Sequence, residues 1–228
     1  MNGSARKRVA VLISGRGSNM KALIEAAKAP DYPAEIVLVL SNRPDAGGLE
    51  TAREAGIEAV AVDHKPFASR EAHEAEVNAA LDRARPDIVC LAGYMRLLTP
   101  GFTARWAGRM INVHPSLLPL FPGLHTHERA IAAGARLHGC TVHFVTEVMD
   151  EGPIIGQAVV PVRPDDTPDG LAARLIPVEH RLYVESLALV ASGGVAMEGA
   201  RSQFAGGSSD AKAPALLSVG GRSLLLQD

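Results

Sequence analysis

Continuous apolar runs alternate with amphipathic segments through the first half of the chain. The runs are rich in Val, Ile and Leu, as is typical of strands buried on both faces of a parallel sheet. They cover residues 9–13, 36–40, 58–62, 87–92 and 110–113. Segments with apolar residues at helical spacing lie between them, at 20–27, 45–55 and 70–85. This alternation predicts a doubly wound, mostly parallel α/β sheet with right-handed crossovers.

The pattern changes after residue 114. A proline-rich loop, 115–123, leads to a short predicted helix at 128–133. Two alternating runs, 139–146 and 154–162, then follow close together. Their spacing predicts a hairpin that adds antiparallel strands to the sheet near the C-terminal end of the domain.

A long helix is predicted over residues 167–189. It begins at a capping threonine, and Pro177 is expected to kink or break it. We therefore predict a single domain over residues 8–198, with halves at 8–113 and 114–198. The Gly-, Ser- and Ala-rich stretch 199–228 is expected to be a flexible tail.

Composition limits the class of function. Of the 228 residues, 47% are hydrophobic, which is enough for a sizeable core, and the formal net charge is −2. There is no basic stripe interleaved with aromatic residues, so we expect no nucleic-acid partner. The basic start, residues 1–8, leads into an apolar run too short for a signal peptide or a membrane span. We expect a cytoplasmic protein, with no membrane partner, whose Cys90 and Cys140 stay reduced.

Two polar residues, Asn112 and His114, stand at the end of the last apolar run, and Pro115 follows them. Because they are two positions apart, a strand would project both side chains to one face. Open α/β sheets bind ligands at this carboxyl edge, where an amide can stabilise an oxyanion and an imidazole can move a proton. Asp150, in the acidic turn of the hairpin, would stabilise the charged imidazole and fix its tautomer. The three residues are candidates for catalysis, and ordinary turn residues are the alternative interpretation.

A glycine-containing turn, residues 14–19, joins the first strand to a helix. Exposed amides and the positive end of a helix bind phosphate in such turns. No third glycine completes the dinucleotide fingerprint. We favour a monophosphate site at Gly17, Ser18 and Asn19, with a plain turn as the alternative. The apolar turn 93–98 reaches the same edge and would hold a flat heteroaromatic ring, unless it is only a packed loop.

Five histidines lie close together in the sequence. They are His114, His125, His127, His138 and His143. Imidazole is a common zinc ligand, but no cysteine or carboxylate with a recognised ligand spacing accompanies them, so we expect no metal. We assign His125 and His127 to the loop, and His138 and His143 to strands. His73 is predicted to lie on the surface of the helix at 70–85.

Six short segments form a set, in unbroken order between residues 9 and 197. They are 12–19 (LISGRGSN), 91–96 (LAGYMR), 112–119 (NVHPSLLP), 122–127 (PGLHTH), 142–145 (VHFV) and Asp150 with 152–153 (GP). This set resembles the phosphoribosylglycinamide formyltransferase family, also called glycinamide ribonucleotide transformylases. The Asn-x-His-Pro-Ser motif is shared by folate-dependent formyltransferases at large. The glycine loop combined with Pro-Gly-Leu-His-Thr-His is more specific to this family.

The resemblance implies a Rossmann-like formyltransferase fold and a reaction of purine biosynthesis. A formyl group would pass from the co-substrate 10-formyltetrahydrofolate to the amine of glycinamide ribonucleotide, giving formylglycinamide ribonucleotide and tetrahydrofolate. The transfer would be direct, through a tetrahedral intermediate and without a metal. The partners would be these small molecules, and the chain is expected to be a monomer or a homodimer.

The resemblance also implies roles for particular residues. Those that it makes catalytic are Asn112, His114 and Asp150. Those that it places at the ribonucleotide phosphate and ribose are Gly17, Ser18, Asn19 and Glu179. Those that it places at the folate are Arg70, Met95, Arg96, Leu97, Leu98, Asn112, Thr146, Glu147, Val148, Met149 and Asp150.

Four places depart from the family pattern outside the catalytic triplet, one of them the unusual stretch 176–178 (IPV) before Glu179. Arg16 stands where a small polar residue is common and would add a phosphate contact. Leu120 replaces a frequent lysine, which removes a basic loop residue. Glu151 replaces a glycine and would stiffen the folate loop.

Two other functions use part of the same residues. A formyltetrahydrofolate hydrolase would need the same Asn, His and Asp, but such enzymes usually carry an extra N-terminal regulatory domain, and few residues precede Val9 here. A non-catalytic nucleotide-binding module would keep the glycine loop without needing the triplet. Dependence of turnover on the acceptor amine distinguishes the three.

Overall fold

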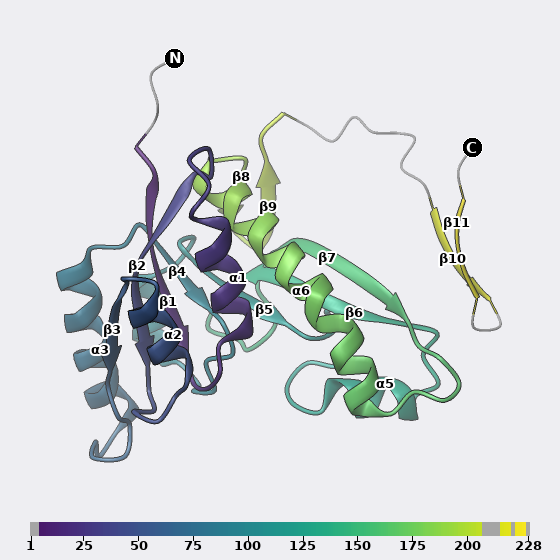
Figure 1. Ribbon diagram of the computed structural model, residues 1–228, viewed down its shortest axis with the longest axis horizontal. Coiled ribbons are helices and arrows are strands. Elements are labelled where there is room, and N and C mark those ends of the chain that lie inside the picture. Colours follow the sequence, from purple (N-terminus) through teal and green to yellow (C-terminus); the bar gives the residue numbers. More distant parts are fainter. Residues whose placement is uncertain (1–4, 207–214, 220–221, 227–228) are drawn as a thin grey trace.

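In the computed structural model of the chain, seven strands form one sheet with helices on both faces (Figure 1). The structure describes residues 5–206, 215–219 and 222–226. The order of the strands in the sheet is β3-β2-β1-β4-β5-β6-β7. They are β1 (Lys7–Ile13), β2 (Ala34–Ser41), β3 (Glu58–Ala61), β4 (Ile88–Leu91), β5 (Met110–His114), β6 (Leu137–Phe144) and β7 (Ile154–Pro161).

The sheet has the predicted mixture of directions. β1 to β5 pair in parallel, while β6 pairs antiparallel with both β5 and β7. The doubly wound sheet with an antiparallel addition is therefore confirmed. The winding reverses between β1 and β4, which is the point where open sheets of this kind form ligand sites.

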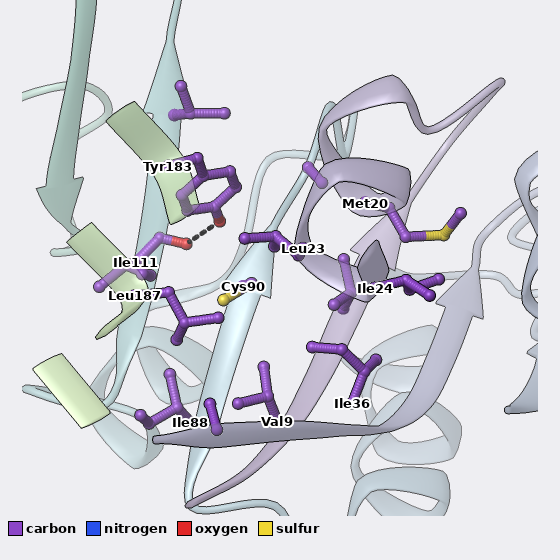
Figure 2. Close-up of a cluster of buried hydrophobic side chains, with 14 of the residues drawn as sticks. Val9, Met20, Leu23, Ile24, Ile36, Ile88, Cys90, Ile111, Tyr183 and Leu187 are labelled. Atoms are coloured by element: carbon purple, nitrogen blue, oxygen red, sulfur yellow. Dashed lines mark hydrogen bonds between the residues drawn. The ribbon is translucent and has the colours of Figure 1, made fainter. Parts of the chain in front are cut away.

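The helices divide between the two faces of the sheet. On one face lie α1 (Ser18–Ala26), α2 (Gly48–Glu54) and α6 (Pro168–Ala191), and on the other lie α3 (Arg70–Ala84) and α4 (Pro100–Arg105). The short α5 (Thr126–Ala132) contacts α6. The alternation of side chains along a strand explains the two layers. Val9, for example, faces α1 and α6 (Figure 2), whereas its neighbour Ala10 faces α3.

Two predicted helices differ from the observed ones. Residues 45–47 form a turn, so α2 begins only at Gly48. The expected break at Pro177 was wrong, because α6 runs without interruption from Pro168 to Ala191. Proline costs a helix about 3 kcal/mol. Burial of apolar side chains along α6, at about 1.5–3 kcal/mol each, outweighs that cost.

The surface position predicted for His73 was also wrong. Its side chain is 2% exposed, and its Nε2 donates to the Val62 carbonyl oxygen at 3.0 Å. Phe67 covers the ring, with centroids 5.5 Å apart. Burial lowers the pKa of His73, although the Val62 carbonyl opposes this shift. The segment after β3 folds back over the first turn of α3, which helical periodicity alone does not reveal.

Part of the predicted flexible tail is regular structure. β8 (Val195–Glu198) and β9 (Arg201–Phe204) pair antiparallel, and Gly199 takes a φ of +59° at the turn between them. Glycine accepts this backbone without strain, so a two-residue hairpin turn is possible here. β10 (Ala215–Val219) and β11 (Arg222–Leu226) form a second hairpin. The prediction for residues 207–214 lies outside the described residues.

Within the part of the chain that the structure describes, no helix combines the length and the apolar character that a membrane crossing requires.

Candidate active site

The three predicted catalytic residues meet at the carboxyl end of β5. Asn112 and His114 project from the same face of that strand, and Asp150 comes from the turn between β6 and β7. The Nδ1 atom of His114 lies 3.5 Å from Oδ2 of Asp150, and each of these two side chains is only 8% exposed. A protonated imidazole at this separation would attract the carboxylate strongly, because little water screens a pair this well buried.

The other contacts of His114 and Asp150 hold this pair in place. Nε2 of His114 lies 3.2 Å from the Phe121 carbonyl oxygen, so both ring nitrogens face oxygen acceptors. A doubly protonated imidazole can satisfy both of them. Asp150 has a φ of +59° and accepts a hydrogen bond of 2.8 Å from the Gly123 amide. The turn that carries Asp150 is thereby tied to the loop that follows β5.

His143 completes the cluster, although the sequence indicated only a strand residue. Its Nδ1 donates to the Phe144 carbonyl oxygen at 2.9 Å, so its Nε2 accepts from Nδ2 of Asn112 at 3.2 Å. The same Nε2 lies 4.0 Å from Oδ1 of Asp150. Burial lowers the pKa of His143 and favours the neutral ring. His143 therefore orients the Asn112 amide, with which it is paired across β5 and β6.

The predicted phosphate-binding residues lie at the N-terminus of α1. Gly17 takes a φ of +68° immediately before the helix, and Ser18 is its first residue. Nδ2 of Asn19 donates to Oε2 of Glu179 at 3.2 Å, while Oδ1 of Asn19 is buried and has no hydrogen-bond partner among the residues that the structure describes. Burial raises the pKa of Glu179, and the bond from Asn19 partly offsets this. An amide, a carboxylate and the positive end of a helix thus converge.

The loop after β4 is anchored to the first strand. The Met95 amide donates to Oγ of Ser14 at 2.8 Å, and Ser14 in turn donates to Asn42. Met95 and Leu97 are exposed, at 64% and 60%. Exposed apolar side chains on an anchored loop offer a contact surface to a ligand.

The predicted folate residues are spread over several places. A pocket of 330 Å³ is lined by Ser14, Gly15, Asn42, Arg43, His64, Gly93, Met95 and Arg96. A second, of 220 Å³, lies between α4, β8 and the β6–β7 turn, and its lining includes Thr146 and Glu147. Arg70 begins α3, and Val148 and Met149 are exposed in the turn that carries Asp150. Neither pocket is lined by Asn112, His114 or Asp150.

The other three of the five histidines noted in the sequence, His125, His127 and His138, form no hydrogen bond to Asn112, His114 or Asp150 among the described residues. His125 is exposed with its Nδ1 3.1 Å from Glu128, and His127 and His138 contact each other through ring nitrogens 3.1 Å apart. Burial lowers the pKa of His138 to about 4. Among residues 5–206, which include all five of these histidines, no group of three or more His, Cys, Asp or Glu side chains is arranged as a metal site.

Comparison with known proteins gives matches over most of the chain. The formyl transferase family model matches residues 7–187. The phosphoribosylglycinamide formyltransferase of Escherichia coli is 46% identical over 189 residues, covering 83% of this chain and 89% of that protein. The trifunctional purine biosynthetic protein adenosine-3 of Drosophila melanogaster is 50% identical over 190 residues, which cover 82% of this chain but only 14% of that protein. This chain therefore spans a small part of the length of the trifunctional relatives.

Solved structures agree with the sequence matches. A phosphoribosylglycinamide formyltransferase from Brucella melitensis is 60% identical with a TM-score of 0.79, covering 82% of this chain and 97% of that one. A formyltetrahydrofolate deformylase from Pseudomonas syringae is 28% identical with a TM-score of 0.81, covering 88% of this chain and 66% of that one. With a family match over residues 7–187 and a relative of similar length at 46% identity, this chain belongs to the formyl transferase family.

Proposed function

We propose that residues 8–198 form one formyltransferase domain, which transfers a formyl group from 10-formyltetrahydrofolate to the amine of glycinamide ribonucleotide. The products are formylglycinamide ribonucleotide and tetrahydrofolate, and the reaction belongs to purine biosynthesis. The observation that carries this proposal is the pair formed by His114 and Asp150 beside Asn112. The names of the Escherichia coli and Brucella relatives support the choice of substrates. The two free, buried cysteines fit a reducing cytoplasm.

The ribonucleotide is assigned to the N-terminus of α1. Amides of Gly17 and Ser18 would bind its phosphate, since the helix end carries partial positive charge. The buried carboxylate of Glu179 would accept hydrogen bonds from ribose hydroxyls. Oδ1 of Asn19, which lacks a partner, would gain one from the ligand. The proposal thus gives each polar group at this site a bonding partner.

The folate is assigned to the two loops that flank the triplet. The loop after β4 contributes Met95, Arg96, Leu97 and Leu98, and the β6–β7 turn contributes Thr146, Glu147, Val148, Met149 and Asp150. Exposed apolar side chains on both loops would cover the flat ring system. Cations at Arg96 and at Arg70 match the carboxylates of the folate tail.

The chemistry requires an oxyanion to be stabilised and a proton to be moved. The neutral amine attacks the formyl carbon, a new carbon–nitrogen bond forms, and the carbonyl oxygen becomes negative. An amide hydrogen of Asn112 and a protonated His114 donate to that oxygen, and the carboxylate of Asp150 supports the imidazolium charge. Collapse of the intermediate breaks the bond to the folate nitrogen, which takes up a proton from the attacking nitrogen through His114 or water.

A formyltetrahydrofolate hydrolase is the second candidate, because the deformylase from Pseudomonas syringae shares the fold. Water would then attack in place of the amine. An absorbance assay for tetrahydrofolate formation, run with and without glycinamide ribonucleotide, separates the two. We expect turnover only with the ribonucleotide. Turnover that does not need the amine favours the hydrolase, and an absence of turnover favours a binding module.

Substitution of the imidazole tests the assignment of the triplet. His114→Ala should abolish transfer while ribonucleotide binding, followed by calorimetry, stays largely intact, because the phosphate site lies on a different element. Near-normal turnover of this variant contradicts the mechanism.

A further inference from the structure

Tyr183, on the buried face of α6, connects the ends of two central strands. Its hydroxyl lies 3.0 Å from the carbonyl oxygen of Leu91 and 3.2 Å from that of Ile111. Figure 2 shows the ring lying among apolar side chains with its hydroxyl directed at Ile111. The side chain is fully buried. One hydroxyl hydrogen is thus shared between carbonyl groups of β4 and β5.

The surroundings keep this hydroxyl in its donor state. Burial raises the pKa of Tyr183 well above 10, and it raises the pKa of the adjacent Cys90 thiol to about 12. Both groups therefore hold their protons. The phenol hydrogen is therefore available to the carbonyl oxygens of Leu91 and Ile111.

The two carbonyl groups lie next to residues of the proposed site. Leu91 and Asn112 are the last pair in the register of β4 with β5. The Ile111 carbonyl belongs to the peptide unit that leads into Asn112, and the Leu91 carbonyl to the one that leads into the loop after β4. A bond to each helps to fix the orientation of both peptide planes at the point where β4 and β5 stop pairing with each other, although β5 stays paired with β6 as far as His114.

α6 also carries Glu179, one turn before Tyr183. Residues four apart lie on the same helix face. On this face of α6, Glu179 accepts a hydrogen bond from Asn19, and Tyr183 bonds the carbonyl groups at the ends of β4 and β5. We propose that Tyr183 is a positioning residue for formyl transfer. It sets the direction of the Asn112 side-chain amide, through the Ile111 carbonyl, and the start of the loop after β4, through the Leu91 carbonyl. This inference rests on the role proposed for Asn112.

The test compares Tyr183→Phe with a matched control, Tyr32→Phe. The Tyr32 hydroxyl donates to the Val184 carbonyl oxygen at 2.8 Å, so it too bonds a main-chain carbonyl, on the same helix but away from β4 and β5. Each variant keeps its ring and loses one such hydroxyl. Net loss of a buried hydrogen bond costs about 1 kcal/mol, so both variants should remain folded and show similar falls in unfolding free energy.

Activity should separate the two variants. Because displacement of a catalytic group by a fraction of an ångström is costly, we expect kcat of Tyr183→Phe to fall about tenfold. Both KM values should stay within about twofold, and Tyr32→Phe should match the wild type. An unchanged kcat in Tyr183→Phe overturns the proposal. An equal fall in both variants also overturns it, because it would indicate general loosening of α6.

A readout without turnover keeps this test separate from the proposed function. Side-chain amide resonances of Asn112 should shift in the nitrogen–proton spectrum of Tyr183→Phe and not in that of Tyr32→Phe. If the resonances do not move, Tyr183 does not position Asn112, whatever the kinetics. If the resonances move in Tyr183→Phe but the wild-type protein shows no amine-dependent turnover, the positioning role holds and the proposed reaction fails.

Discussion

Asp150→Asn removes one negative charge from the active-site cluster and changes little else. The amide has nearly the shape of the carboxylate, and its oxygen can still accept from the Gly123 amide. Asparagine also accepts a positive φ better than most residues, so the backbone at +59° is not strained by the change. The variant therefore isolates the electrostatic support that His114 receives.

The size of the effect follows from the geometry. Charges 3.5 Å apart in a site with an effective dielectric constant of about 20 interact by about 5 kcal/mol. Gly123 already compensates part of the carboxylate charge, and the new amide remains a dipole beside the ring. We expect a net loss of about 3 kcal/mol in stabilising the charged imidazole at the transition state. That loss lowers kcat about a hundredfold.

The assay follows tetrahydrofolate formation at saturating substrates, with Asp166→Asn as the control. Asp166 is as well buried as Asp150, with 6% of its side chain exposed, and its carboxylate binds Arg174. This control loses a buried charge of the same kind without touching the triplet. It should lose stability but keep kcat. KM for the ribonucleotide should stay unchanged in both variants.

The reasoning is refuted if Asp150→Asn retains more than about a third of the wild-type kcat while its folded fraction is unchanged. A comparable fall in Asp166→Asn would also refute it, because the loss would then not depend on the charge beside His114.

Three further predictions concern other parts of the structure. Glu179→Gln should weaken ribonucleotide binding about tenfold in calorimetry. Burial raises the pKa of the Glu179 carboxyl above its ordinary 4.5, so the folded wild type holds this proton more tightly than the unfolded chain and becomes less stable as pH rises through and above 4.5. Urea titrations at pH 4 and pH 7 should show a smaller loss of unfolding free energy in the variant than in the wild type. An equal loss argues against burial of Glu179 as its cause. Gly139→Ala would place a Cβ 2.0 Å from the Ala158 carbonyl oxygen and should cost about 1–3 kcal/mol of unfolding free energy. In the control Gly47→Ala the new Cβ would have none of the described atoms within 4 Å, so the unfolding free energy should change by less than about 0.5 kcal/mol. Similar losses in the two variants would be inconsistent with close packing of β6 against β7. Because burial lowers the pKa of His138 from 6.5 to about 4, the unfolded chain takes up this proton first, and unfolding free energy is lost as pH falls from 6.5 to 4. In urea titrations over this range, His138→Gln should make the unfolding free energy depend less on pH. An unaltered dependence would assign the loss to other groups.

Local patterns in the sequence were sufficient for the order of the seven strands of the sheet and of most helices, whereas α4 (Pro100–Arg105) was not predicted. Buried parallel strands leave continuous apolar runs, and the helices between them leave a 3.6-residue period, so the alternation from 9 to 113 specified the doubly wound sheet. Asn112 and His114 were placed on one face because a strand has a period of two. Where a local rule met tertiary packing, as at Pro177 and His73, packing prevailed.

Contacts across the chain depended on the tertiary structure. His143 became the partner of Asn112 only through the antiparallel register of β5 and β6. Asn19 and Glu179 are 160 residues apart, and Tyr183 bonds carbonyl groups 72 and 92 residues away. A periodic pattern records which face of an element is buried, but it carries no information on which distant element covers that face. The sequence by itself therefore determined the seven strands of the sheet, most of the helices and the motif that ends β5. Packing of α6 and β6 against the sheet decided which side chains surround that motif.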